Sequence, residues 1–421
     1  MRTGDNNFEL EHMVSDFCTA PFCIYGAGIV ATSIYTVIKT LYQKTPLFFL
    51  VSDAAEGKMD ENPLEIDGIP VKRLSEWQRE LWGTREMQKP QNVPAQDTSN
   101  ASGSAVHPTY YLVVVPETHH VAITASLHSL HIEDSQICLF TGTLENQFME
   151  TYYSSLPDCY TVNNLIGVPE QTEDVDAALS CQSEISSANP ADIQVFQAKC
   201  HVDRALQHPG QNPFYVEPIQ VGADLTDLII SELRDNTGEN ISDKNRNYCE
   251  LTATYYAWRN CQAAYKGLCH YRRIFEIDNE QVRILLDKKE DWDVILPYPS
   301  IHYPDISTQH IRYIKDADWQ AMLQALAETA LDYFEAYQKL IESGEQYFFN
   351  YNMLIARAEV FDDYCSFLFS VLERAEALTA PKGWERADRF AGYMGENLTT
   401  LYFLKNRDKL KIVYAGKKWL T

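Results

Sequence analysis

The sequence predicts an α/β protein of two domains, each with a mostly parallel sheet covered by helices. Short apolar runs alternate with helical segments in both halves of the chain, the pattern of sheets buried on both faces. The length of 421 residues is too great for one ordinary core, and polar stretches interrupt the pattern. We expect a Rossmann-like domain at 1–168, a linker at 169–192 and a second α/β domain at 193–421.

The N-terminal half opens with an apolar strand and a glycine turn at 21–31, followed by a helix at 32–44. Further strands are expected at 47–52, 66–71, 110–115 and 137–140. One helix is expected to begin at Leu74, and another follows the strand at 110–115 and ends near His131. The stretch 84–108 is rich in Gln, Asn, Ser and Pro, so we expect an exposed loop there.

The C-terminal half repeats the alternation. Ser242 is a good N-cap for a helix whose buried stripe is Tyr248, Leu251, Tyr255 and Trp258. Strands are expected at 193–196, 267–273, 292–297 and 348–357, and helices at 316–342 and 360–376.

Charge and cysteine usage restrict the class of protein. The net charge of −24 argues against nucleic acid as a partner, because phosphate backbones need clustered Lys and Arg. Ten cysteines without a C-x-x-C pair indicate buried thiols in a reduced compartment. The first 20 residues are too polar for a signal peptide, and no apolar run reaches the about 18 residues of a bilayer span. We expect a cytoplasmic protein; attachment to the inner face of a membrane stays open.

The turn Gly26-Ala-Gly28 follows the first strand, where glycines let a backbone approach phosphates at a helix N-terminus. Ala31 stands at the third glycine position, and Asp53 could receive a ribose hydroxyl. These residues are weak candidates for nucleotide binding. The alternative is a Rossmann-like domain that uses the glycines for packing alone.

A polar loop at 235–245 precedes the helix at Ser242. It holds more carboxylate, amide and hydroxyl groups than a surface connection needs, which suits a polyhydroxylated ligand. The candidates for donor binding in it are Asp235, Asn236, Gly238, Asn240, Ser242, Lys244 and Asn245. The alternative is a solvated loop with helix caps.

The run His270-Tyr-Arg-Arg273 comes at the carboxyl end of an apolar strand, where open α/β sheets bind ligands. Arg272 and Arg273 could pair with phosphate oxygens, and with His270 they are further donor-binding candidates. Such cations would stabilise a diphosphate leaving group as its charge grows. The alternative is that the arginines pair with the domain's many carboxylates.

Several stretches of residues 193–421 together resemble the DUF4422 family, a group of bacterial proteins regarded as capsular and exopolysaccharide glycosyltransferases. The matching stretches are 218–223, 235–242, 244–245, 248–252, 255–260, 267–273 and 352–355. The resemblance implies a GT-A-like fold and transfer of a sugar from a nucleotide sugar, such as a UDP-sugar, to a glycan acceptor. It also makes Asn352 a candidate for acceptor binding, and it leaves the N-terminal half as an accessory domain.

The catalytic base is sought among carboxylates within the matching stretches. Glu396 lies in the pattern Gly392-Tyr-Met-Gly-Glu396, in which Asn397 replaces the arginine that family members carry. Glu250 is the second candidate; a structural role is the alternative for both. The histidine-lysine pair of many family members appears here as Ala198-Lys199, which leaves the acceptor site less defined.

A metal ion is not clearly implied. Asp291-Trp-Asp293 has the spacing of an Asp-x-Asp metal site but precedes its apolar run instead of following it. Fixed cations at 270–273 could replace Mg²⁺ or Mn²⁺, so the sequence leans towards no metal. No cofactor other than the donor is implied.

Two other functions stay open. One is a nucleotide- or sugar-binding regulatory or scaffold protein without turnover. The other, an NAD-dependent oxidoreductase, depends on Gly26-Ala-Gly28 alone and lacks a hydride-transfer site. The donor sugar, the linkage, its stereochemistry and the oligomeric state are not determined by the sequence.

Overall fold

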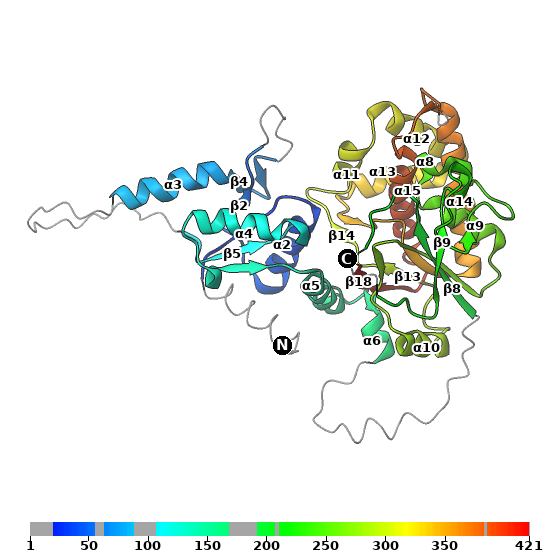
Figure 1. Cartoon of the computed structure of the whole chain (residues 1–421), viewed down its shortest axis with the longest axis horizontal. Helices are drawn as coiled ribbons and strands as arrows, with labels where there is room; N and C mark the ends of the chain where they lie inside the picture. Colours follow the sequence, from blue (N-terminus) through cyan, green and yellow to red (C-terminus); the bar gives the residue numbers. More distant parts are fainter. Residues whose placement is uncertain are drawn as a thin grey trace, which may run out of the picture. The chain divides into compact units, whose positions relative to one another are not determined.

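The computed structural model describes residues 20–54, 63–87, 107–167, 192–206, 210–382 and 385–420. The chain divides into two compact units, Met1–Met149 and Glu150–Thr421 (Figure 1). Both combine a largely parallel sheet with helices, so the α/β class expected from the sequence is confirmed. Most of the expected linker at 169–192 and of the polar stretch at 84–108 lies outside the described residues.

The first unit contains a six-stranded sheet in the order β3-β4-β2-β1-β5-β6. All neighbours are parallel except β3 and β4, which form a hairpin. Its strands are β1 (Phe22–Tyr25), β2 (Phe49–Val51), β3 (Glu65–Ile66), β4 (Ile69–Arg73), β5 (Tyr110–Val113) and β6 (Ile137–Leu139). The five parallel strands run in the order third, second, first, fourth, fifth, which is the Rossmann arrangement.

Helices cover both faces of this sheet. Tyr35 packs edge-on against Phe49 at 5.5 Å, while Trp77 packs against the neighbouring Phe48 at 4.7 Å. Adjacent strand residues face opposite sides, so these helices lie on opposite faces. The helices are α2 (Ile29–Tyr42), α3 (Leu74–Met87), α4 (His120–Ser129) and α5 (Gly142–Ser155), with 3₁₀ turns η1 (Glu117–His119) and η2 (Asp134–Gln136).

Two expectations for this unit need correction. The single strand expected at 66–71 is the β3–β4 hairpin, because Asp67 and Gly68 adopt positive φ values of 53° and 74°. These are the angles of a tight hairpin turn. The loop expected from residue 84 begins later, since α3 continues to Met87.

The glycine turn after β1 has a packing role. Gly26 has a φ of 132°, and a Cβ atom there would lie 2.4 Å from the carbonyl oxygen of Val114. At Gly28, which precedes α2 with a φ of −85°, a Cβ atom would meet nothing within 4 Å. Only the first glycine is required by the close contact with the segment after β5.

We predict that Gly26→Ala destabilises the protein by about 2 kcal/mol or more, because the substitution combines a forbidden φ with a backbone clash. Gly28→Ala is the matched control and should change stability by well under about 1 kcal/mol. Urea unfolding of the full chain, followed by circular dichroism, measures both. Equal effects of the two substitutions would contradict the packing role of Gly26.

The second unit contains a ten-stranded mixed sheet. Its main path is β10-β9-β8-β11-β16-β13-β17-β7, and β12 and β18 extend from β11. Only β16 runs against its neighbours along the main path. The strands are β7 (Tyr160–Thr161), β8 (Ile193–Lys199), β9 (Val216–Gln220), β10 (Leu233–Arg234), β11 (Tyr265–His270), β12 (Arg273–Phe275), β13 (Val294–Pro297), β16 (Leu354–Arg357), β17 (Ile412–Ala415) and β18 (Lys417–Trp419). A separate pair consists of β14 (Ser300–Ile301) and β15 (Tyr347–Phe348).

Helices also cover both faces of this sheet. Lys266 on β11 reaches Asp362 on α14 at 3.1 Å, whereas the preceding Tyr265 stacks on Trp292 in the core on the opposite face. Side chains alternate along a strand, so His270 shares the α14 face with Lys266. The α-helices are α6 (Val162–Ile166), α8 (Asn245–Tyr248), α9 (Leu251–Asn260), α10 (Asn279–Asp287), α11 (Ser307–Tyr313), α12 (Asp316–Thr329), α13 (Leu331–Glu342), α14 (Ala358–Leu378) and α15 (Phe390–Asn406), with 3₁₀ turns η4 (Ala223–Leu225) and η5 (Ser242–Lys244). No helix in the described ranges is long and apolar enough to cross a bilayer.

The second unit begins earlier along the chain than the expected boundary. Strand β7 pairs with β17, and Glu150 accepts hydrogen bonds from Tyr298, from Thr161 at 2.5 Å and from Asn163 at 3.1 Å. Residues 150–166, expected in the first domain, therefore pack with the second sheet. Polar side chains, which carry no periodic signal, contribute to this connection together with the buried ring of Tyr153, which stacks on Tyr298.

Several segments expected as single elements are interrupted. The helix after Ser242 breaks at Cys249 (φ 51°, ψ −129°), and the helix at 316–342 breaks at Ala330 (φ −150°). The strand at 348–357 turns at Tyr351 and Asn352, whose φ values are 75° and 51°. The strand at 267–273 ends at His270, and the chain folds back so that Arg273 pairs with it.

Candidate functional site

The candidate site lies at the carboxyl edge of the second sheet. His270 ends β11 beside Ala198 of β8, and Lys199 follows on β8. Because β16 runs antiparallel, the residues that precede it, including Asn352, reach the same edge. The topology therefore brings Lys199, His270 and Asn352 together where open α/β sheets bind ligands.

Arg272 and Arg273 lie in the β11–β12 turn at this edge. The backbone carbonyl of Arg272 accepts a hydrogen bond from Leu420 at 2.9 Å, and Arg273 pairs across the strands with Trp419. The Arg273 guanidinium lies 4.1 Å from the ring centroids of both Trp419 and Tyr351. Aromatic faces attract such a cation without neutralising it.

Neither guanidinium forms a hydrogen bond or ion pair with any residue that the structure describes. The Nε atoms of both arginines, and Nδ1 of His270, are buried without a hydrogen-bond partner. Burial and the charge of Arg272 lower the pKa of Arg273. Burial raises the pKa of Asp203, a carboxyl group within electrostatic reach of Arg272. The two arginines, called the guanidinium pair below, are thus not held by carboxylates of the described residues.

Glu250 lies buried beneath this edge, at the start of α9. Its Oε1 accepts a hydrogen bond from the Asn352 amide at 2.8 Å, and its Oε2 lies 3.7 Å from Nε2 of His270. Burial opposes ionisation, but the nearby His270 and the hydrogen bond from Asn352 lower the pKa of Glu250 overall. We therefore take Glu250 to be ionised near neutral pH.

Glu396 lies on α15 next to the same turn. Its Oε1 accepts a hydrogen bond from the backbone N–H of Tyr351 at 2.8 Å, and Gln309 approaches Oε2 at 3.4 Å. Burial and the negative charge of Glu250 raise the pKa of Glu396 to about 7. The site thus holds two coupled carboxyl groups whose pKa values are shifted in opposite directions, an arrangement typical of acid–base sites.

Asn352 binds Glu250 and directly follows Tyr351, whose backbone N–H binds Glu396. Its side chain is fully buried and also donates to the carbonyl of Gly392 at 3.2 Å and accepts from Thr399 at 3.3 Å. A Cβ atom at Gly395 would lie 2.7 Å from Leu251 Cδ1 and 3.2 Å from Asn352 Oδ1, so glycine lets α15 pack closely against this amide. Asn352 is thus held by contacts within the site, and its expected role in acceptor binding stays a prediction.

The comparison with known proteins identifies the family of this site. Residues 200–407 match the profile of DUF4422, a domain of unknown function, and this range includes the turn at 270–273, both carboxylates and Asn352. The chain carries a DUF4422 domain.

One solved structure with partial similarity is that of the bifunctional glycosyltransferase WbbM in its apo form. It shares 24% identity with a TM-score of 0.47 and covers 55% of this chain, and this chain spans 45% of its length, less than half. No curated protein sequence matched the chain.

Most candidate residues of the polar loop at 235–245 in the DUF4422 domain form hydrogen bonds or ion pairs with other residues of the same unit. Asp235 is fully buried and accepts hydrogen bonds from the N–H groups of Gly222 at 2.9 Å and Ala223 at 3.1 Å, and from Ser242 Oγ at 2.5 Å. Ser242 begins η5 after Ile241 and does not act as the expected side-chain N-cap. Buried Asp235 and Ser242 therefore hold the loop framework together.

Other members of the loop are similarly engaged. Lys244 pairs with Glu376 at 2.7 Å, Asn245 donates to the carbonyl of Cys249 at 2.7 Å, and Asn240 donates to Gly238 at 2.9 Å. Gly238 has a φ of 64° and lies against Asn260. Asn236 donates to Asp224 at 2.9 Å, but its Oδ1 is buried without a partner among the described residues. Donor binding by this loop stays a prediction.

Arg389 is a site residue that the sequence analysis missed. It precedes α15 in a left-handed conformation, donates to Cys249 Sγ at 3.2 Å, and lies within electrostatic reach of Glu250 and Glu396. Burial raises the pKa of the Cys249 thiol to about 12. No sequence pattern indicated Arg389, because its position depends on the segment that leads into α15.

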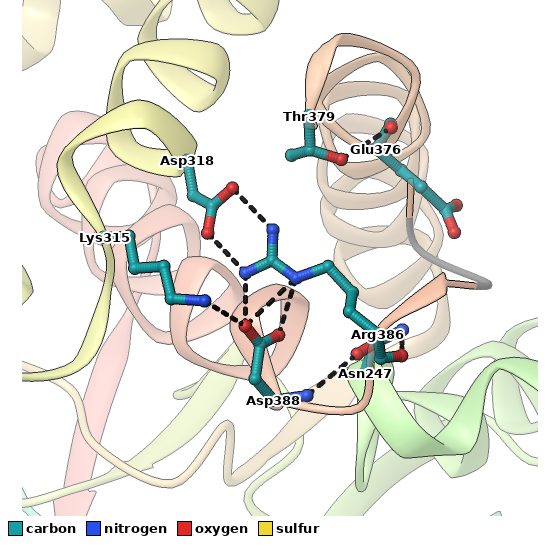
Figure 2. Close-up of polar contacts among 7 residues, drawn as sticks. All are labelled: Asn247, Lys315, Asp318, Glu376, Thr379, Arg386 and Asp388. Atoms are coloured by element: carbon teal, nitrogen blue, oxygen red, sulfur yellow. Dashed lines mark hydrogen bonds and ion pairs between the residues drawn. The ribbon is translucent and has the colours of Figure 1, made fainter. Parts of the chain in front are cut away.

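A buried ion-pair network anchors that segment (Figure 2). Arg386 bonds Asp318 on α12 through two N–H groups at 2.7 and 2.5 Å and Asp388 through Nε at 2.9 Å. Lys315 reaches Asp388 at 3.0 Å, and Asn247 donates to the carbonyl of Arg386 at 3.0 Å. Exposure of the Arg386 and Asp318 side chains is 6% and 2%, so the network fixes the start of α15 against α12 and α8.

We predict that Arg386→Ala destabilises the protein by roughly 3–5 kcal/mol, because it leaves the buried Asp318 carboxylate without its partner. Arg259→Ala is the control: Arg259 pairs with Glu239 at 3.0 Å, and both side chains are exposed. Loss of such a pair should cost about 1 kcal/mol or less. Thermal unfolding of the full chain measures both, and a comparable effect for the two variants would contradict an anchoring role for Arg386.

The Asp-x-Asp run is remote from this edge. Asp293 precedes β13, accepts the N–H of Lys411 at 2.8 Å and lies 3.4 Å from Arg357. This is the amino end of a strand parallel to β11, so Asp291 and Asp293 lie at the opposite edge of the sheet from His270. Within the described ranges, no group of three or more His, Cys, Asp or Glu residues is arranged to hold a metal ion.

The nucleotide candidates of the first unit have simpler roles in the structure. Asp53 accepts a hydrogen bond from Ser75 Oγ at 2.6 Å, and Gly28 precedes α2 without a side-chain cap. Gly26 contacts the backbone after β5. Nucleotide binding by Gly26, Gly28 and Asp53 stays a prediction.

Proposed function

We propose that the protein is a glycosyltransferase that moves a sugar from a nucleotide-sugar donor to a glycan acceptor in capsular or exopolysaccharide synthesis. The observation that carries the proposal is the guanidinium pair beside a carboxyl group of pKa about 7, at the carboxyl edge of one sheet. The motifs shared with the DUF4422 family support the same chemistry, and we expect the GT-A-like arrangement that they imply.

The guanidinium pair fits the leaving group. Nucleotide-sugar transfer releases a nucleoside diphosphate, whose negative charge grows as the bond to the sugar breaks. Planar guanidinium groups bind phosphate oxygens through two parallel N–H groups. Fixed cations with buried, unpartnered N–H groups at the described edge stabilise this charge without first breaking an internal ion pair.

Glu396 fits the general base. In the proposed reaction the acceptor hydroxyl oxygen forms a bond to the anomeric carbon, and its proton passes to Glu396. The bond from that carbon to the diphosphate oxygen breaks, and the electron pair leaves with the nucleoside diphosphate. A base with a pKa near the working pH is efficient, because it is ionised yet still basic.

Glu250 has a different role in this scheme. It is hydrogen-bonded to Asn352, and the nearby His270 also favours its ionised form. Its negative charge in turn raises the pKa of Glu396. We therefore assign Glu250 to tuning the base and positioning His270.

We predict that Arg272→Ala and Arg273→Ala each reduce nucleoside diphosphate release by roughly 10²–10³-fold, the cost of removing one preorganised stabilising group. Arg283→Ala is the control, because Arg283 lies exposed on α10 on the other face of the sheet. Release is measured over a panel of UDP-, GDP- and dTDP-sugars with mixed glycan acceptors. Unchanged rates in both variants would refute the role of the pair.

We predict that Glu396→Gln lowers turnover by about 10²–10⁴-fold while stabilising the protein above pH 7. The raised pKa means that the folded state keeps a proton longer than the unfolded state between the reference value of 4.5 and about 7. Stability of the native protein therefore falls as pH rises through this window, and glutamine removes that loss. Turnover of the native protein should rise with pH and level off above about 7. The pKa of about 7 already includes the effects of the charges of Glu250, Arg273 and Arg389 on Glu396.

These two readouts separate a catalytic from a structural role. Turnover and thermal unfolding are measured on the same samples from pH 5 to 9. A variant that retains activity, or that loses stability above pH 7, would contradict the assignment of Glu396. A protein that binds nucleotide sugars in thermal-shift assays but never releases a nucleoside diphosphate would instead favour the regulatory alternative.

A further inference from the structure

Helices α11 and α15 pack together beside the proposed base, and their facing residues form two matched pairs. Gln309 and Tyr313 are four residues apart on α11, so they share one face of that helix. Tyr393 and Glu396 are three residues apart on α15 and also share a face. Gln309 meets Glu396 at 3.4 Å, and Tyr313 stacks on Tyr393 with ring centroids 5.0 Å apart.

The first pair contains an unsatisfied polar atom. Gln309 is only 2% exposed, and its Oε1 has no hydrogen-bond partner among the described residues. Its Nε2 makes only a long contact with Glu396. A buried amide oxygen without a donor is rare in folded proteins and indicates a missing group. A hydroxyl group arriving beside Glu396 would be such a donor.

The second pair offers an aromatic surface. Tyr313 is 43% exposed although its ring stacks on that of Tyr393, with an angle of 18° between the two ring planes. The Arg389 guanidinium lies 5.5 Å from the Tyr393 ring centroid, which links this surface to the charged groups around Glu396. Pyranose rings present C–H groups that pack on such aromatic faces, while their hydroxyl groups bond to neighbouring amides.

We propose that Gln309, Tyr313, Tyr393 and Glu396 form an acceptor site for an oligosaccharide of at least two sugar residues. The hydroxyl that accepts the transferred sugar lies beside Glu396 and within reach of Gln309 Oε1, and the next sugar of the chain stacks on Tyr313. This inference rests on the proposed function. It adds that the acceptor is recognised over two successive sugars, one at each pair.

The test compares acceptors of different length with three variants on α11. Methyl hexopyranosides and their di- and trisaccharide homologues serve as probes, both in turnover with the donor panel and in saturation-transfer difference NMR. For wild type we expect kcat/KM at least 10-fold higher with the disaccharide than with the monosaccharide. Tyr313→Ala should abolish this preference and the NMR signal of the second sugar, whereas Tyr313→Phe should retain both.

Ile311→Ala is the matched control, because Ile311 is 68% exposed on the same helix and lies two residues from Gln309. It should leave the length dependence unchanged. Hydrolysis of the donor without acceptor should be equal in all variants, which shows that the donor site is intact.

The outcomes separate this inference from the proposed function. Turnover with the same length dependence in wild type and Tyr313→Ala overturns the acceptor site and leaves the transferase standing. Disaccharide signals that vanish in Tyr313→Ala, without turnover by any variant, support a glycan site and overturn the transferase. Absence of any disaccharide signal and of any length dependence overturns the acceptor site.

Discussion

The candidate site depends on one buried amide, that of Asn352. The turn that precedes β16 places this residue in a left-handed conformation, from which its side chain reaches Glu250, Gly392 and Thr399. Three elements, β16, α9 and α15, are thereby fixed to each other at one point. Each of the two carboxyl groups is bonded to this turn, Glu250 through the amide and Glu396 through the backbone of Tyr351. The distance between the carboxyl groups of Glu250 and Glu396, and therefore their electrostatic coupling, depends on the geometry of Tyr351 and Asn352.

The coupling explains why two similar carboxyl groups differ in protonation. Glu250 has His270 nearby and a hydrogen-bond donor in Asn352, which together outweigh the effect of burial on its pKa. Glu396 receives one backbone hydrogen bond, and the charge of Glu250 adds to the effect of burial. The pair is best regarded as one titrating system in which the first ionisation belongs mainly to Glu250. In this arrangement the ionised Glu250 orients His270, and Glu396 can accept a proton near neutral pH.

Sequence patterns predicted the repeating parts of the fold and failed where backbone direction changes without a change in periodicity. Leu251, Tyr255 and Trp258 form a regular stripe with Tyr248, so nothing in the pattern reveals the break at Cys249. The run Asn350-Tyr-Asn352 could have been recognised, because asparagine tolerates left-handed turns. Glu250 and Glu396 were found as separate candidates from motifs, but their common attachment to the turn at Tyr351 and Asn352 depends on tertiary contacts. No sequence motif indicated Arg386 or Arg389. The partners of Arg386 are Asp318 on α12, about 70 residues away, and Asp388 just before α15.

The position of Arg273 shows how an acidic chain can keep a cationic edge. The chain has 59 acidic and 35 basic residues, and some of its guanidinium groups, such as that of Arg386, are paired with carboxylates. Arg273 is instead paired across the strands with Trp419 and packed against Tyr351. The rings stabilise the positive charge through their faces but offer no acceptor in the plane of its N–H groups. The Arg273 guanidinium therefore lacks hydrogen-bond acceptors among the described residues, and two oxygens of a phosphate group could accept hydrogen bonds from its N–H groups.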